Sequence, residues 1–168
     1  MKSLFAAALV LAAPVAAAEV TASGPDHYVL KHEAVSDLAP EALWKKLIRP
    51  ETWWHPDHTY SGDAANLELD AAAGGLWREV WEGGSVSHGQ VLLAKPGEQL
   101  RLDAPFGPLQ EMGVAVVWTI TLSAEGAGTK VVFDEVASGS SASGLDAIAP
   151  AVDFVKSEAI ARLTASPE

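Results

Sequence analysis

The sequence predicts an α+β fold in which a curved antiparallel sheet wraps around one long C-terminal helix. Two observations lead to this prediction: a series of strand-like segments separated by glycine-containing turns, and a final segment whose apolar residues recur every three or four positions. Because one helix covers only part of the concave face of such a sheet, a pocket is expected between them. Small-molecule binding is then the default functional expectation.

Residues 1–18 are typical of an export signal. Lys2 supplies a positive charge, the apolar run from Leu4 to Val15 follows, and three alanines lead to an expected cleavage before Glu19. The apolar run is too short to span a bilayer comfortably, although an uncleaved membrane anchor is the alternative. We therefore expect a periplasmic or secreted protein without stable membrane insertion, and one domain over residues 19–168.

Composition narrows the classes of partner. The formal net charge of the 168 residues is -11, so nucleic acid and anionic lipid headgroups are poor partners, since both require clustered Lys and Arg. The absence of cysteine excludes disulfides, a thiol nucleophile and zinc–thiolate sites. Stability must therefore come from packing.

The first part of the domain is expected to hold one strand and a helix. Alternation predicts a strand over Tyr28–Ser36. A helix is predicted to start near Asp37, with Pro40 in its first turn, and to end at Pro50. Its apolar stripe consists of Leu43, Trp44, Leu47 and Ile48.

Six further strands are expected in series, joined by tight antiparallel turns. They are Asn66–Asp70, Gly75–Glu82, Val86–Ala94, Gln99–Ala104, Gly113–Ser123 and Thr129–Ala137. In the longest of them, the period of two predicts an inward face made of Val114, Val116, Trp118, Ile120 and Leu122.

The C-terminal helix is predicted from Leu145 onward, and Pro150 is expected to mark its true first turn after a short preceding turn. The helical period is carried by Leu145, Ile148, Val152, Val155, Ala159 and Leu163.

Several short motifs stand in a characteristic order along the chain. They are Trp44, Pro50–Trp53, Gly74-Gly75, Trp77, His88-Gly89, Pro96-Gly97, Gly107–Leu109 and Val152–Leu163. In their order, these motifs and segments resemble the SRPBCC or START-like helix-grip superfamily, and within it the branch of activator of heat-shock-protein ATPase homologues. The resemblance implies a helix-grip fold with a hydrophobic cavity, and family roles that range from lipid and hormone binding to aromatic cyclisation and chaperone assistance. The export signal departs from the cytosolic chaperone-assisting relatives.

A polar pair is expected on the hairpin that turns at Gly83-Gly84. If Glu82 faces Ser85, then Glu79 pairs with His88 on one face of the sheet. A carboxylate beside an imidazole can orient a ligand or serve as a general acid/base pair; the alternative is a cross-strand stabiliser, because a one-residue slip would separate the two. The predicted ligand-binding set on this face and the facing strand is Trp77, Glu79, Trp81, His88, Gln90 and Trp118.

Other candidate sites are weaker. His55, Asp57 and His58 offer three metal ligands, but Pro56 and the missing fourth ligand favour a solvated loop, so we expect no metal and no cofactor. Serines without a nucleophile-elbow setting are expected to lie in turns and on the surface.

The sequence thus favours an exported protein that binds a hydrophobic or aromatic small molecule over an enzyme. The alternatives are a cyclase-like or hydrolase-like enzyme that uses Glu79 and His88, and a chaperone-like protein-interaction module with an exposed apolar patch. If Glu79 and His88 line the pocket, Glu79→Gln and His88→Ala should alter ligand binding more than stability.

Overall fold

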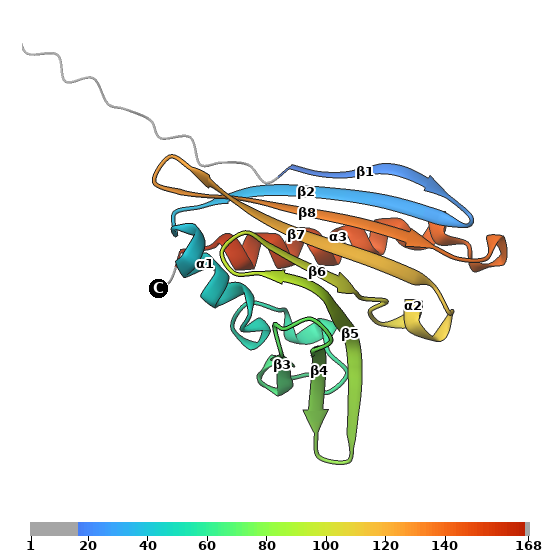
Figure 1. Ribbon diagram of the computed structural model, residues 1–168. Coiled ribbons are helices and arrows are strands. Elements are labelled where there is room, and N and C mark those ends of the chain that lie inside the picture. The colour runs from blue at the N-terminus through green and yellow to red at the C-terminus, as the bar shows by residue number, and fades with distance from the viewer. Residues whose placement is uncertain (1–16, 167–168) are drawn as a thin grey trace, which may run out of the picture.

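The computed structural model describes residues 17–166, which form an eight-stranded antiparallel sheet and a long C-terminal helix, α3 (Leu145–Thr164) (Figure 1). The spatial order of the strands is β1-β2-β8-β7-β6-β5-β4-β3. The strands are β1 (Ala17–Gly24), β2 (His27–Ser36), β3 (Leu67–Leu69), β4 (Leu76–Trp81), β5 (Gly84–Lys95), β6 (Gln99–Asp103), β7 (Ala115–Glu125) and β8 (Gly128–Ser138). The predicted α+β fold is confirmed.

Helix α3 packs along the sheet face formed by β1, β2 and β8 (Figure 1). The long crossing from β2 to β3 carries α1 (Pro40–Leu47) and three short 3₁₀ turns, η1 (Pro50–Thr52), η2 (Pro56–His58) and η3 (Ala64–Asn66). A further short helix, α2 (Pro108–Glu111), joins β6 to β7. None of the helices in the described range is long and apolar enough to cross a membrane.

Strand β1 and helix α2 were not predicted. Strand β1 pairs with β2 from Ala17↔Glu33 to Gly24↔His27, so Ala17 and Ala18 of the predicted signal belong to a paired strand, while residues 1–16 lie outside the described residues. Helix α2 is only one turn long and has no amphipathic period of its own. Both elements carry weak local signals, and tertiary packing determines them.

The buried core contains the residues that the alternating pattern of β7 predicted to face inward. The inward face of β7 is buried at all five predicted positions, from Val114 to Leu122. Aromatic rings dominate this core: Trp118 packs edge-on against Phe133 at 5.0 Å between centroids, and Trp77 packs against Trp53 at 5.7 Å. This rigid aromatic layer supports the sheet face that α3 covers.

Helix α3 runs without interruption through Pro150, so the prediction that Pro150 marks its first turn is wrong. Gly144 adopts the left-handed conformation (φ 62°) immediately before the helix, and the Leu145 amide donates a hydrogen bond to the Pro25 carbonyl at 2.9 Å. Leu145 and Ala149 are buried against the sheet. The first turn is therefore fixed by tertiary contacts, which accommodate a proline that removes one helical hydrogen bond.

Strand β5 is bent by two bulges, one against β4 near Trp77 and Arg78 and one against β6 between Val91 and Leu93. At Gly89 the two backbones approach so closely that an added Cβ would lie 2.5 Å from the carbonyl oxygen of Asp103. Only glycine fits such a close approach without displacement of the strand. The bend places His88, the preceding residue, on the buried face.

Candidate functional site

A cavity of about 440 Å³ lies between the sheet and α3. Cavities of this size accommodate small organic molecules. Helix α3 contributes Ile148, Ala151, Val152, Val155 and Lys156; the sheet contributes His88 and Glu135; the connections contribute Trp54, His58, Thr59, Tyr60, Ala104, Phe106, Gly107, Pro108, Leu109 and Glu111. The wall is mainly apolar and carries a few polar groups.

The middle of α3 differs from its ends in a way that explains the cavity. Ile148, Val152 and Val155 belong to the predicted core stripe, yet they are only partly buried because they line the cavity. Leu145 and Leu163, near the two ends of the helix, are fully buried. The helix therefore packs on the sheet at both ends, and between them Ile148, Val152 and Val155 face the cavity.

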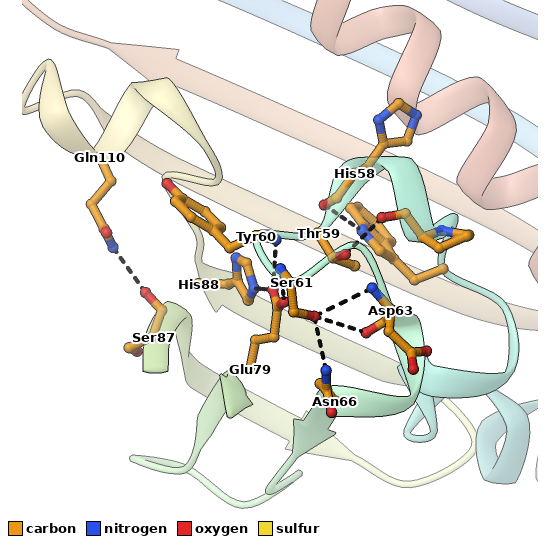
Figure 2. Close-up of polar contacts among 12 residues, drawn as sticks. His58, Thr59, Tyr60, Ser61, Asp63, Asn66, Glu79, Ser87, His88 and Gln110 are labelled. Atoms are coloured by element: carbon orange, nitrogen blue, oxygen red, sulfur yellow. Dashed lines mark hydrogen bonds and ion pairs between the residues drawn. The ribbon is translucent and has the colours of Figure 1, made fainter. Parts of the chain in front are cut away.

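One polar group at the cavity wall is the Glu79–His88 pair (Figure 2). Nε2 of His88 lies 2.9 Å from Oε2 of Glu79, and both side chains are buried. The Glu79 carboxylate also accepts hydrogen bonds from the backbone amides of Tyr60 (3.0 Å) and Ser61 (2.6 Å). Glu79 therefore fixes the loop that follows η2 and the orientation of the His88 ring.

The pair forms although the predicted register is wrong. Trp81 pairs with Gly84 and Glu79 with Val86, each two positions away from the predicted partner. The shift is even, so Glu79 stays on the inner face. The bulge then makes His88 the extra residue of β5 and brings its ring beside Glu79.

The same bulge explains why Gln90 does not share the face of Glu79 and His88, although the sequence predicts that it does. It reverses the in–out alternation after His88, so Gln90 is exposed and its Nε2 donates to the Gly74 carbonyl at 3.3 Å. Gln90 therefore faces away from the cavity.

The environment sets the protonation of the pair. Burial raises the pKa of the Glu79 carboxyl, but hydrogen bonds from Ser61, Tyr60 and His88 outweigh burial, and the net pKa is below its ordinary value. Burial lowers the pKa of the His88 imidazole, and the Glu79 carboxylate offsets this only in part. A neutral His88 that donates from Nε2 to Glu79 keeps an unprotonated Nδ1, which is a proton acceptor.

A second polar group contains residues that the sequence reasoning missed. Lys156 of α3 and Glu135 of β8 are both buried, with Nζ 2.7 Å from Oε2. The hydroxyl of the buried Tyr28 donates to the other carboxylate oxygen, Oε1, at 2.7 Å. Nζ also lies 3.2 Å from the centroid of the Trp118 ring, a cation–π contact.

Burial shifts the titration of this group as well. Burial lowers the pKa of the Lys156 ammonium, while the Glu135 carboxylate acts in the opposite direction. Burial, with the neighbouring Glu135 charge, raises the pKa of the Tyr28 hydroxyl, which therefore stays protonated and acts as a donor. The three side chains tie β2, β8 and α3 together at the cavity wall.

The tryptophans divide between core and cavity. Trp77 and Trp118 are fully buried in the aromatic core, and Trp81 is partly buried beside Gly84 at the hairpin turn. None of these three contributes to the cavity lining in the described residues, whereas Trp54 does. Of the six residues predicted to bind ligand, His88 lines the cavity and Glu79 supports it.

Of the three predicted metal ligands His55, Asp57 and His58, only His58 lines the cavity. Nε2 of His58 lies 2.9 Å from Oε2 of Glu158 on α3, and the His58 ring packs edge-on against Phe154 at 6.4 Å. Asp57 is exposed. Within residues 17–166, no group of three or more His, Asp or Glu side chains converges as metal ligands would.

No protein-family model matches the sequence, and no curated protein matches it. Solved structures do match. A protein from Rhodobacter sphaeroides is 21% identical, with a TM-score of 0.58 over 88% of this chain and 96% of its own. Proteins from Chromobacterium violaceum (19% identity, TM-score 0.57, 83% and 99% coverage) and Mesorhizobium loti (18%, 0.56, 81% and 93%) are similar. At these identities the likeness concerns the fold.

The fold is a helix-grip fold. The order of the strands, the long C-terminal helix on one face of the sheet and the cavity beneath that helix all fit this architecture. Because one fold supports many functions, the function must be argued from the cavity itself.

Proposed function

We propose that this chain is an exported helix-grip protein of the SRPBCC superfamily, which binds a hydrophobic or aromatic small molecule in the cavity between the sheet and α3. The observation that carries the proposal is the cavity of about 440 Å³ with its mainly apolar wall. An apolar ligand that covers the apolar wall of a cavity removes that wall from water, which stabilises the complex. The export signal predicted from the sequence over residues 1–18 supports a periplasmic or secreted location.

Native mass spectrometry of the protein purified from its own periplasmic extract tests this function, and denaturing mass analysis then identifies a released molecule. The blocking variant is Ala151→Trp, because Ala151 is exposed on α3 and lines the cavity, so an indole there fills the ligand's space. Ala147→Trp is the matched control, since Ala147 is exposed on the same helix but does not line the cavity.

We expect the wild type and Ala147→Trp to retain a bound molecule, and Ala151→Trp to have lost it. A bound molecule that survives in Ala151→Trp would place binding elsewhere. If all three proteins carry no bound molecule and none binds an aromatic probe by calorimetry, the binding function is refuted.

Acid/base catalysis on the bound molecule is a second candidate, favoured by the Glu79–His88 geometry. The imidazole is buried, lies within hydrogen-bond distance of the carboxylate and lines the cavity, which are the features expected of a general base. Conversion of the identified ligand by the wild type, abolished in His88→Gln while ligand affinity persists, would support catalysis. Unchanged ligand after prolonged incubation would leave a binding protein only.

A further inference from the structure

The Lys156–Glu135 pair at the cavity wall has unused hydrogen-bonding capacity. Apart from the 2.7 Å ion pair itself, neither Nζ of Lys156 nor Oε2 of Glu135 has a hydrogen-bond partner among the described residues. An ammonium carries three N–H donors, and each carboxylate oxygen accepts about two hydrogen bonds. Buried polar atoms in folded proteins usually use their hydrogen-bonding capacity, so the capacity that the ion pair leaves unused is available to a further partner.

The surroundings of the pair do not supply that partner. The ring of Trp118 stands 3.2 Å from Nζ and that of Phe106 stands 5.1 Å from it, measured to the ring centroids. Aromatic faces stabilise a cation but accept no strong hydrogen bond and donate none to a carboxylate. Both Lys156 and Glu135 belong to the cavity lining, so a molecule bound in the cavity can supply the missing hydrogen bonds once it displaces the side chain that covers the two buried atoms.

The charge of the pair selects the chemistry of the ligand's polar group. The pair is neutral overall whether its proton resides on Lys156 or on Glu135. A ligand carboxylate would add an uncompensated charge in an apolar cavity, next to Glu135, and that arrangement is costly. A hydroxyl adds no charge and can both donate and accept.

We propose that the ligand is an apolar or aromatic alcohol, including a phenol, whose hydroxyl accepts a hydrogen bond from Nζ of Lys156 and donates one to Oε2 of Glu135. This inference rests on the proposed binding function and specifies its ligand class. Nζ and Oε2 are shielded from solvent, and the partly exposed ring of Phe106 lies 5.1 Å from Nζ, so this binding mode requires that ring to move aside as the hydroxyl enters. The apolar body of the ligand then occupies the cavity beside Val152 and Val155.

Isothermal titration calorimetry at pH 7 with three matched probes, naphthalene, 2-naphthol and 2-naphthoate, tests this inference. The wild type is expected to bind 2-naphthol at least about tenfold more tightly than naphthalene, because hydrogen bonds to charged groups stabilise a complex by at least that factor. It is expected to bind 2-naphthoate more weakly than 2-naphthol. The three probes share one ring system, so the differences report the polar group.

The variant Lys156→Met/Glu135→Gln removes both charges, and the new amide oxygen can still accept the hydrogen bond of Tyr28. It is expected to bind naphthalene within about threefold of the wild type, which shows that the cavity is intact, and to lose most of the preference for 2-naphthol. Lys130→Met is the matched control. Nζ of Lys130 lies 2.8 Å from Oε2 of Glu33, and neither residue lines the cavity. It should keep the wild-type preference.

The outcomes separate this inference from the proposed function. Equal affinity of the wild type for naphthalene and 2-naphthol keeps the binding function and overturns the hydroxyl site. A preference for 2-naphthol that persists in the double variant, or tighter binding of 2-naphthoate, also overturns it. Failure of all three probes overturns the hydroxyl site; it overturns the binding function as well only if the purified protein also carries no bound molecule in native mass spectrometry. If the double variant does not fold, the ranking of the three probes by the wild type still decides.

Discussion

Replacement of Lys156 alone is expected to destabilise the protein strongly. Lys156→Met keeps a side chain of similar length, so it opens little space in the core, but it leaves the Glu135 carboxylate buried (2% exposed) without its cation. Removal of one partner of a buried ion pair typically costs about 3–5 kcal/mol. For a domain of this size, that loss corresponds to a fall in melting temperature of roughly 10 °C.

The double variant isolates the cause of that loss. In Lys156→Met/Glu135→Gln no charge remains buried, and the amide oxygen can accept the Tyr28 hydroxyl that now bonds to Glu135 at 2.7 Å. Replacement of a complete buried ion pair by neutral groups is often neutral or stabilising. We therefore expect the double variant to lie within about 1–2 kcal/mol of the wild type, although it carries one more substitution than Lys156→Met.

Urea unfolding at pH 7, followed by tryptophan fluorescence, measures the free energy of unfolding of all three proteins, provided that the m-values agree. Lys130→Met, at the half-exposed Lys130–Glu33 pair, serves as the surface control and should change little. The reasoning is refuted if Lys156→Met is as stable as the wild type. It is refuted equally if the double variant is less stable than Lys156→Met, because the loss would then come from packing and not from an uncompensated charge.

Three further predictions concern the Glu79–His88 pair. Burial lowers the pKa of native His88 from its ordinary 6.5, so below about pH 6.5 the unfolded chain binds a proton that the native state does not. The free energy of unfolding should therefore fall as the pH drops below about 6.5. Urea titrations of His88→Gln should lack that part of the fall. Glu79→Gln should lower the free energy of unfolding by about 1–3 kcal/mol, because the NH₂ group of glutamine would replace one of the two oxygens that accept the Tyr60 and Ser61 N–H groups. Stability equal to that of the wild type would contradict this role. Gly89→Ala should push β5 away from β6 and shift the His88 titration measured by NMR, because its Cβ would lie 2.5 Å from the Asp103 oxygen; an unchanged titration would show that the strand does not hold the ring.

The Glu79→Gln prediction revises the expectation from sequence. A carboxylate that pairs only with His88 would affect ligand binding more than stability. The structure adds two backbone amides of the loop after η2 to its partners, so Glu79 also holds the wall of the cavity. The expectation that binding changes more than stability remains for His88→Ala.

Local pattern was sufficient for most of the sheet because glycine turns and the period of two determine where strands begin, end and face. The prediction failed where backbone irregularity decides the outcome. The register of β4 and β5 was predicted wrongly because the hairpin turns at Glu82-Gly83, one residue earlier than the predicted Gly83-Gly84. The outward direction of Gln90 was missed because the bulge at His88 has no distinct sequence signature. Glu79 and His88 still met because the bulge compensated for the error.

The Lys156–Glu135 pair did leave a signal in the sequence. Glu135 alternates with Phe133 and Ala137, which places a carboxylate on the inward face of β8, and Lys156 lies four residues after Val152 on the apolar stripe of α3. An opposite charge on each of two facing apolar surfaces predicts a buried pair, since neither charge is tolerated alone. The distance between the two residues, and the cavity beside them, needed the three-dimensional structure.

Stability and binding make opposite demands on this pair. Two apolar side chains would stabilise the contact between α3 and β8 at least as well as an ion pair whose remaining donors and acceptors are unused. Those unused groups carry a free-energy penalty in the empty protein, and a ligand hydroxyl that satisfies them removes it. The pair therefore adds little to folding and much to discrimination, because a ligand without a hydroxyl leaves the penalty in place. The Glu79–His88 pair differs in this respect: its carboxylate already receives three hydrogen bonds, so Glu79 holds the scaffold of the cavity and only His88 remains available to a ligand.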